Sequence, residues 1–566
     1  MRRLVITLVA VLVVLAIGIA LLQTGPRIPE GSVLTVELSG DLAEAPPVDT
    51  LARLTSRGPA LPTLLLALEM ASADERVSAV LLHIRPLRVG YARIQELRDA
   101  VSRVRAADKR VLAVLDMAVL NATRETYLAS AADQVYVVPG FLGPLAGFAG
   151  QSFFLGSFFE KIGVEFEYVR IGDYKSAVET FTASEMSEPA REMTNDLFDG
   201  LFEQITSGIA EGRDLSRDTV ASLIESAPAT ADEYLAAGLA DGIADRDEVL
   251  ESAGLEDAEE ISTADYLRVD PTRLGLRDGP RIALIFGDGT LVQSRGTPLA
   301  RTSAADEIER ALETAADDER VRAIVLRVNS PGGSSLASDQ LWLAIRRARE
   351  KKPVVVSLGE TAASGGYYVA SAADAILAEP ATLTGSIGLF LLRPSFSGLY
   401  EKLGIGTEVV ARGPYAGMAG SDQPLTADQL QHTREWIRSL YAGFLARVAE
   451  GRGVEPAEID AVGQGRVWLG ATALEHGLVD ELGGLWAAVQ RAKREANIAD
   501  DVDPQRVLFP GPRSATEQMR QLFRGELAAW LRLQLFPVEL PEVLTWDWLR
   551  LEGELLMLPP YWIEIR

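Results

Sequence analysis

An internal repeat restricts the fold of this chain more than any other feature. Four matches occur in the same order along the chain, each separated by about 240 to 250 positions. They pair 74–82 with 318–326, 128–133 with 369–374, 237–241 with 476–480, and 33–38 with 282–286. The first pair reads DERVSAVLL against DERVRAIVL. The chain therefore contains two copies of a domain of about 240 residues, which we call the first and the second repeat.

Both repeats alternate short apolar runs with amphipathic segments. The second repeat predicts strands at 323–328, 354–358 and 375–378 and helices at 337–349 and 365–373. A longer amphipathic helix is predicted at 426–450, with a counterpart near 189–211 in the first repeat. Alternating strands and helices are typical of a largely parallel sheet covered by helices. The predicted fold class is therefore α/β, with two tandem domains.

Composition limits the classes of function. The chain has 566 residues, and its hydrophobic content of 48% is sufficient for more than one core. A net charge of −25 disfavours nucleic acid as a partner. The absence of cysteine excludes disulfides, thiol catalysis and cysteine metal sites.

The N-terminus predicts a membrane anchor. Residues 4–22 carry no charge, and nineteen helical residues are long enough to cross a bilayer. Residues 1–3 contain Arg2 and Arg3, which the positive-inside rule keeps in the cytoplasm. Because the apolar run is longer than in most signal peptides, we favour an uncleaved single-pass anchor. The remainder would then lie across the membrane, as expected for a bacterial inner-membrane protein facing the periplasm.

The rest of the chain divides by composition and by the repeat. We expect a membrane-exit segment with the first strand at 23–60 and the first repeat at 61–250. An acidic connector at 251–280, the second repeat at 281–500 and a tail at 501–566 follow. The tail contains several aromatic residues among prolines and acidic residues. Few basic residues accompany them, so burial or a subunit contact is favoured over a membrane-surface helix. The role of the tail is left open by the sequence.

Ser364 lies where a predicted strand turns into a helix. It is flanked by Ala363, Gly365 and Gly366, which leave its hydroxyl uncovered. Such a serine can be a nucleophile, or it can cap the helix with its side chain. The local sequence alone favours the helix cap.

The two repeats differ where a catalytic site would be. Alignment of the repeats places Thr123 and Arg124 opposite Ser364 and Gly365, so an open serine turn is not expected in the first repeat. The other differences set Leu87-Arg-Val89 against Pro331-Gly-Gly333, Leu145 against Ser386, and Lys175 against Ala416. The second repeat thus holds the hydroxyls and glycine turns, and the first repeat holds the lysine. One site could be assembled from both repeats.

A serine nucleophile needs a base. The three histidines, His83, His432 and His476, are distant in sequence from Ser364 and are interpreted as structural. A lysine can act as the base if burial keeps its amine neutral. Lys175 suits this role, although an isolated lysine of this kind is more often a surface residue packed along its aliphatic stem.

Four motifs together resemble one family. They are YKSA at 174–177, NSPGGS at 329–334, AASGGY at 362–367 and TLTGSIG at 382–388. With the duplication, they resemble the long form of the signal peptide peptidase A family, also called protease IV, from the anchor to about residue 490. The resemblance implies two ClpP/crotonase-like domains and a membrane-anchored periplasmic serine endopeptidase. Its substrates would be signal-peptide remnants left in the membrane after secretion.

The resemblance also implies roles for individual residues. Ser364 would be the nucleophile that forms an acyl-enzyme, Lys175 the general base, and Ser386 a residue that orients the lysine. Backbone groups of Gly332, Gly333 and Gly365 would bind the oxyanion. No metal or cofactor is expected, and the assembly would be a homotetramer. Whether Lys175 meets Ser364 within one chain or across subunits is left open.

Two alternatives remain at this stage. A crotonase-like enzyme could use the glycine turns as an oxyanion hole for acyl-CoA thioesters. The predicted anchor disfavours this alternative, because it places both repeats across the membrane from the cytoplasm, where CoA thioesters occur. A catalytically inactive membrane scaffold is the other alternative, and the presence of Ser364, Lys175 and Ser386 disfavours it.

Overall fold

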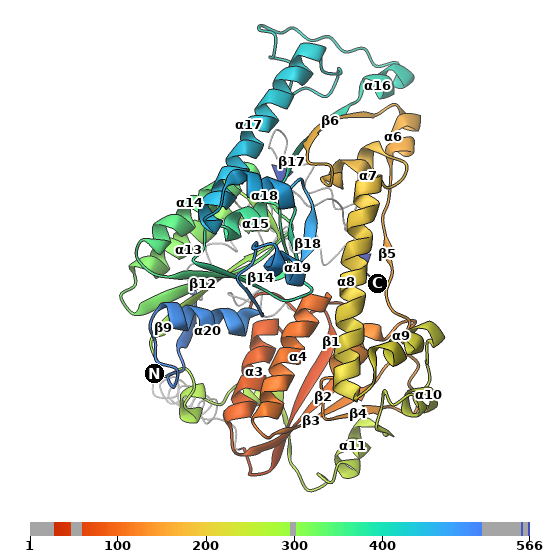
Figure 1. Ribbon diagram of the computed structural model, residues 1–566, viewed down its shortest axis with the longest axis vertical. Coiled ribbons are helices and arrows are strands. Elements are labelled where there is room, and N and C mark those ends of the chain that lie inside the picture. Colours follow the sequence, from red (N-terminus) through yellow and green to blue (C-terminus); the bar gives the residue numbers. More distant parts are fainter. Residues whose placement is uncertain (1–27, 47–58, 295–301, 512–555, 558–563, 566) are drawn as a thin grey trace, which may run out of the picture.

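Three β-sheets organise the protein in the computed structural model (Figure 1). The structure describes residues 28–46, 59–294, 302–511, 556–557 and 564–565. One sheet belongs to the first repeat and one to the second, and a third sheet joins strands from both.

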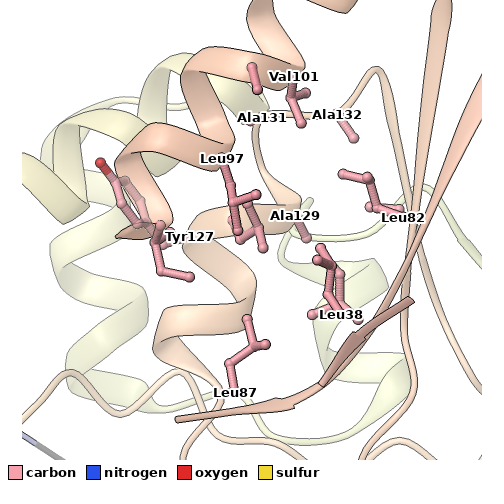
Figure 2. Close-up of a cluster of buried hydrophobic side chains, with 14 of the residues drawn as sticks. Leu38, Leu82, Leu87, Leu97, Val101, Tyr127, Ala129, Ala131 and Ala132 are labelled. Atoms are coloured by element: carbon pink, nitrogen blue, oxygen red, sulfur yellow. The ribbon is translucent and has the colours of Figure 1, made fainter. Parts of the chain in front are cut away.

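The sheet of the first repeat has six strands in the order β7-β4-β3-β2-β1-β8, and its pairings are parallel. These strands are β1 Ser32–Gly40, β2 Val77–Leu87, β3 Arg110–Leu115, β4 Gln134–Val137, β7 Gly242–Ile243 and β8 Glu260–Ser262. Val and Leu dominate β2 because both faces of a covered parallel sheet are buried. Figure 2 shows part of this core, where Leu38 and Leu82 of the sheet pack near Leu97 and Val101 of helix α4, Tyr91–Ala106.

The sheet of the second repeat has the same plan. Its main path is β18-β16-β14-β12-β9-β20, with β15 paired to β14 and β19 paired to β15. The strands are β9 Arg281–Asp288, β12 Val321–Ser330, β14 Val354–Ala363, β15 Ala375–Ala378, β16 Leu383–Gly385, β18 Val467–Leu469, β19 Glu481–Leu482 and β20 Gln505–Leu508. The pairings are parallel except that of β16 with β18.

The third sheet brings the two repeats together. Its order is β11-β10-β13-β21-β17-β6, and β6 from the first repeat runs antiparallel to β17 from the second along seven residue pairs. Its strands are β6 Glu165–Ile171, β10 Thr290–Val292, β11 Thr302–Ala304, β13 Gly333–Ser334, β17 Leu389–Ser395 and β21 Leu556–Met557. A separate pair joins β5, Gly150–Gln151, to β22, Glu564–Ile565. The segment of the first repeat that follows β6 therefore starts beside the second repeat.

Helices cover the sheets (Figure 1). Those of the first repeat, besides α4, are α3 Leu61–Ala73, α5 Thr123–Ala129, α6 Gly156–Ile162, α7 Glu179–Thr182, α8 Glu188–Arg213, α9 Arg217–Ser226, α10 Ala231–Ala236, α11 Arg246–Ser252 and α12 Thr263–Tyr266. Those of the second are α13 Ala305–Asp317, α14 Ser335–Arg349, α15 Gly365–Ala370, α16 Ser397–Leu403, α17 Ala427–Arg452, α18 Pro456–Val462, α19 Gly470–Glu475 and α20 Leu485–Glu495. Single 3-10 turns span Ser176–Val178 and Pro271–Leu274.

The predicted α/β pattern is confirmed. The predicted strands at 323–328, 354–358 and 375–378 lie in β12, β14 and β15, and the predicted helix at 337–349 lies in α14. The long helices predicted at 189–211 and 426–450 are α8 and α17, each with 26 residues.

The structure differs from the prediction at three places. The segment 251–280, expected to be a connector, supplies β8, which extends the sheet of the first repeat beside β1. Likewise β20, expected to belong to the tail, extends the second sheet beside β9. Both strands are short and contain charged or polar residues, so they lack the apolar run that identifies a strand. The helix predicted at 365–373 ends earlier, at Ala370.

The predicted anchor, residues 4–22, and most of the tail lie outside the described residues. Within the described part of the chain, no helix combines the length and the apolar composition needed to cross a membrane.

Candidate active site

Ser364 occupies a strained turn between β14 and α15. Its φ of 54° and ψ of −113° are rare for a residue with a side chain. Its amide donates to the carbonyl of Gly385 at 2.8 Å, which fixes the turn. The side chain makes no capping hydrogen bond to the helix, so the helix-cap interpretation is wrong. The hydroxyl is instead directed to a group from the other repeat.

That group is the amine of Lys175. Lys175 follows β6 in the first repeat, and its Nζ lies 2.8 Å from Ser364 Oγ. Both side chains are completely buried. The two residues, 189 positions apart in one chain, therefore meet within that chain.

Ser386 completes the contacts of the amine. Lys175 Nζ lies 2.8 Å from Ser386 Oγ and donates to the Ser386 carbonyl at 3.0 Å. Ser386 also has a positive φ, 51°, and its amide donates to the carbonyl of Arg466 at 2.7 Å. Both oxygens of Ser386 thus contact the lysine amine, and its own backbone is held by Arg466, the residue before β18.

The surroundings of Lys175 favour the neutral amine. Burial lowers the pKa of Lys175 well below its ordinary value of 10.5. The hydrogen-bond partners of Nζ in the described residues are hydroxyl and carbonyl oxygens. None of these partners carries the negative charge that would stabilise an ammonium ion.

A segment that the sequence did not single out holds the lysine in place. The amide of Tyr174 donates to the carbonyl of Gln464 at 3.0 Å, and the amide of Gly465 donates to the carbonyl of Ile387 at 2.8 Å. A Cβ on Gly465 would lie 2.6 Å from Lys175 Cβ, so only glycine allows this approach. We call residues 463–466, Gly-Gln-Gly-Arg, the clamp segment. In the sequence, the one distinctive feature of this segment is its two glycines between a helix and a strand, and such glycines are equally typical of an ordinary turn.

The three predicted oxyanion glycines lie together, but they are not equivalent. A Cβ on Gly365 would lie 3.2 Å from Gly332 Cα and 3.3 Å from Gly333 N. The amide of Gly332 donates to Ser330 Oγ at 3.1 Å. The Gly332 amide therefore already has an acceptor within its own turn, contrary to the expectation that it binds the oxyanion. Gly333 and Gly365 are the better candidates for the oxyanion donors.

The corresponding place in the first repeat is filled by side chains. The amide of Leu87 donates to Glu125 Oε1 at 2.7 Å, and Arg124 Nη1 donates to the carbonyl of Leu87 at 3.0 Å. Thr123, which aligns with Ser364, accepts the amide of Gly147 at 2.9 Å. A second site of the same kind is therefore not formed there.

The three histidines contact other groups. His83 Nε2 lies 2.9 Å from Asp116 Oδ2, the His432 ring stacks on Tyr415, and the His476 ring packs on Trp468. None of these contacts involves Ser364. In the described residues, no group of three or more histidine, aspartate or glutamate side chains is placed to hold a metal ion.

Comparisons with known proteins identify the family of the chain. The model of peptidase family S49 matches residues 103–259 and 346–499. Serine protease SPPA, chloroplastic, of Arabidopsis thaliana is 34% identical over 484 residues, which cover 83% of this chain and 70% of that protein. Protease 4 of Haemophilus influenzae is 30% identical over 477 residues, covering 78% of this chain and 74% of that protein. Among solved structures, a ClpP1 mutant from Listeria monocytogenes matches 37% of this chain and 94% of its own, with 17% identity and a TM-score of 0.24.

The two matched regions fall one in each repeat and together cover more than half of the chain. They include Lys175 in the first region and both Ser364 and Ser386 in the second. The chain therefore belongs to peptidase family S49 and is a serine protease of its long, duplicated signal peptide peptidase A form.

Proposed function

We propose that this protein is a membrane-anchored serine endopeptidase that uses Ser364 and Lys175 as a catalytic dyad. The observation that carries the proposal is the buried Lys175 amine 2.8 Å from Ser364 Oγ, since this geometry suits direct proton transfer. The proposed substrates are signal-peptide remnants, cleaved on the periplasmic side of the inner membrane.

The first half of the reaction forms an acyl-enzyme. Ser364 Oγ attacks the carbonyl carbon of the scissile peptide bond while its proton passes to the neutral Lys175 amine. The developing oxyanion is stabilised by the amides of Gly333 and Gly365. The lysine ammonium then gives its proton to the leaving nitrogen, the C–N bond breaks, and an ester on Ser364 remains.

The second half releases the product. A water molecule attacks the ester carbonyl, and Lys175 takes a proton from that water. The same proton returns to Ser364 Oγ as the ester bond breaks, which restores the starting state. Ser386 is a positioning residue throughout, because its two oxygens fix the direction of the lysine amine.

The apolar run at 4–22 and the family support the location and the substrate. A chain anchored by that run would hold its site close to the membrane in which signal-peptide remnants are left.

We also propose that the protein assembles as a homotetramer, and the contact between its two repeats supports this. Helix α4 of the first repeat packs on the second repeat, with the Ala92 amide 3.4 Å from Glu360 Oε1. The repeat alignment places Leu336 of α14 opposite Ala92, and Leu343 opposite Asp99. Leu336 and Leu343 are 58% and 38% exposed. The same contact could therefore recur between the α14 of one chain and the first repeat of the next.

Two substitutions test the dyad. Ser364→Ala and Lys175→Ala should each lower kcat/KM for a peptide substrate by at least about 10³-fold, with an unchanged circular dichroism spectrum. Both should also lose labelling by a fluorophosphonate probe, whereas Lys161→Ala, at an exposed lysine of the same repeat, should keep activity and labelling. Wild-type turnover by either dyad variant would rule out the mechanism. A wild-type protein that neither cleaves nor labels would favour the inactive scaffold.

A further inference from the structure

Arg466 joins the two repeats close to the lysine amine. It is the last residue of the clamp segment, and its carbonyl accepts the Ser386 amide at 2.7 Å. Its side chain, 14% exposed, reaches helix α8 of the first repeat, where it forms ion pairs with Glu192, at 2.8 Å, and with Asp196. One residue of the second repeat therefore contacts both Ser386, which holds the amine of Lys175, and a helix of the first repeat.

The guanidinium of Arg466 also lies on the ring of Tyr174, the residue before Lys175. Its central carbon is 4.6 Å from the centroid of the Tyr174 ring. Aromatic faces attract cations, and the attraction is stronger where water is partly excluded. The Tyr174 hydroxyl donates to Glu192 Oε1 at 3.1 Å. The clamp segment therefore holds Tyr174 twice, by its amide through Gln464 and by its ring through Arg466.

The groups around the guanidinium suit an arginine and no other cation. Its central carbon is also 4.6 Å from the centroid of the Trp468 ring, and Trp468 Nε1 donates to the carbonyl of Val462 at 2.9 Å. Hydrogen bonds from Arg466 and Tyr174 lower the pKa of the Glu192 carboxyl, so it is charged at neutral pH. A planar guanidinium can contact aromatic rings and two carboxylates at once, which a lysine ammonium cannot.

The repeat that lacks the serine turn also lacks this arginine. At the offset of 239 positions that pairs 237–241 with 476–480, Arg466 aligns with Ala227, and Trp468 aligns with Ala229. The second repeat thus carries the arginine and the tryptophan together with Ser364 and the glycine turns. Their presence beside the site, and their absence from the first repeat, indicate a role in the site.

We infer that Arg466 is a positioning residue that keeps the segment of Tyr174 and Lys175 closed against the clamp segment and excludes water from the lysine amine. This inference rests on the proposed function, because it takes Lys175 to be the base. Without the guanidinium, Tyr174 loses its ring contact and the two repeats lose both ion pairs at this point. Burial is what lowers the pKa of Lys175, so water at the amine would raise that pKa toward its ordinary value of 10.5.

Arg466→Met tests the positioning through turnover. We expect kcat for a peptide substrate to fall at least about tenfold at neutral pH with little change in KM, since the base is displaced and less often neutral. The rise of kcat/KM with pH should also move to higher pH. A loss of folded protein alone would lower activity by the same factor at every pH. A kcat and a pH profile equal to those of the wild type would overturn the inference.

Arg213→Met is the matched control. Arg213 is the last residue of α8, its side chain is 8% exposed, and it pairs with Asp241 at 2.8 Å. Its substitution also removes a largely covered arginine from an ion pair, but none of the contacts of Arg213 involves the clamp segment. The control should lose stability and keep the kcat and the pH profile of the wild type. A matching shift of the pH profile in Arg213→Met would overturn a specific role of Arg466.

A second variant approaches the same contact from the first repeat. Glu192→Gln combined with Asp196→Asn removes both ion pairs through side chains that are 53% and 55% exposed, so the core is not disturbed. The ring contact of Arg466 with Tyr174 is kept. The pH profile should therefore move in the same direction as in Arg466→Met, by a smaller amount. An unchanged profile would overturn the part of the inference that assigns closure to α8.

Chemical labelling separates this inference from the catalytic proposal. The full chain is treated with acetic anhydride, and acetylation of Lys175 is measured by mass spectrometry. We expect Lys175 to be protected in the wild type and in Arg213→Met, and to be acetylated at least about tenfold faster in Arg466→Met, because opening of the segment exposes the amine. This readout needs no turnover. Equal protection in the wild type and Arg466→Met would overturn the inference, whereas faster acetylation with unchanged kcat would support it and count against Lys175 as the base.

Discussion

A lysine can replace histidine as the base of a serine protease when its amine is kept neutral. In this protein Lys175 is completely buried, and its amine contacts oxygens of two serines. Burial disfavours the ammonium ion, and no carboxylate among these partners restores it. The same residue would be protonated and ineffective as a base on an exposed surface.

The pH dependence of activity follows from this shift. In the proposed mechanism Lys175 must be neutral to accept the proton of Ser364, and burial places its pKa well below 10.5. We therefore expect kcat/KM to be lost as the pH falls through the lowered pKa of Lys175 and to reach a plateau above it, far below 10.5. The pH–rate profile of peptide cleavage measures this. If activity instead rose only near 10.5, Lys175 would not be the depressed base.

Ser386 acts on the same amine from a backbone that is itself strained. Its φ of 51° and that of Ser364, 54°, are both in the left-handed region. Each residue is held there by an amide hydrogen bond to a neighbouring segment, from Ser386 to Arg466 of the clamp segment and from Ser364 to Gly385 of β16. The strain is thus held by the sheet around the site, which keeps both hydroxyls directed at Lys175.

At the scale of elements, the clamp segment explains how a lysine from one repeat is held in the other. It lies between α18 and β18, and its backbone accepts from Tyr174 and Ser386 and donates to Ile387. Gly465 is the closest point, because a side chain there would overlap Lys175. The clamp segment therefore sets the position of Lys175.

Gly465→Ala tests this positioning. The new Cβ would lie 2.6 Å from Lys175 Cβ and nitrogen, so the loop carrying Lys175 must move. We expect kcat to fall about 10²-fold with a smaller change in KM, since a displacement of about 1 Å at a catalytic group has this cost. Peptide cleavage kinetics and thermal unfolding of the same variant supply the measurement.

Gly453→Ala is the matched control for backbone strain. Gly453 also has a positive φ, 68°, but a Cβ there meets nothing within 4 Å. Both variants should lose similar stability from the strain, while only Gly465→Ala should lose turnover. Equal losses of kcat in the two variants would show that strain, and not displacement of Lys175, is responsible.

How far the sequence predicts this protein depends on the kind of feature. The apolar runs of β12 and β14 and the internal repeat identify the α/β pattern, because burial on both faces leaves a strong signal. Comparison of the repeats also selects Ser364, Lys175 and Ser386, which the structure places in contact. The helix-cap interpretation of Ser364 failed because a capping side chain and a free nucleophile share the same local sequence. The commitment of Gly332 to Ser330, the clamp segment and the short strands β8 and β20 depend on contacts between distant segments, which one sequence does not display.

At the scale of the whole molecule, buried charges join the two repeats. Arg327 of β12 lies in the second repeat. It forms ion pairs with Glu44, in the segment before the first repeat, and with Glu96 of α4 in the first repeat. Its Nη1 also donates to Ser357 Oγ at 2.8 Å. Glu96 in turn accepts the amide of Leu485, at the start of α20, at 3.0 Å. Since Lys175 and Ser364 come from different repeats, contacts between the repeats also support the proposed site.

Removal of Arg327 should therefore weaken both the fold and the site. Arg327→Met removes the guanidinium from two buried carboxylates, although Glu44 keeps its ion pair with Arg93, and we expect a loss of about 3–5 kcal/mol in the free energy of unfolding. Arg320→Met, which breaks an ion pair between Arg320 and Asp318 with the arginine side chain 69% exposed, should cost far less, because an exposed ion pair contributes little to stability. Urea unfolding of both variants measures the difference. Similar losses would mean that the buried pairs do not hold the repeats together.

The exposed side of α14 is where the proposed assembly can be tested. The face of α4 that contacts the second repeat has an exposed counterpart on α14, where Leu336 and Leu343 lie seven positions apart on one side of the helix. If this counterpart contacts the first repeat of a neighbouring chain, Leu336→Asp, opposite the buried Ala92, would bury a charge at each contact. We expect a cost of about 2–5 kcal/mol per contact and a shift from tetramer to smaller species in light scattering.

Leu120→Asp is the control for that variant, because Leu120 is 94% exposed and lies outside α14. It should leave the mass of the assembly unchanged. Because Lys175 and Ser364 meet within one chain, the smaller species formed by Leu336→Asp should keep the dyad and cleave short peptides at a rate per chain within a few-fold of the wild type. A wild-type mass for Leu336→Asp would exclude α14 as the contact. Loss of mass together with loss of all cleavage would instead mean that the neighbouring chain completes the site.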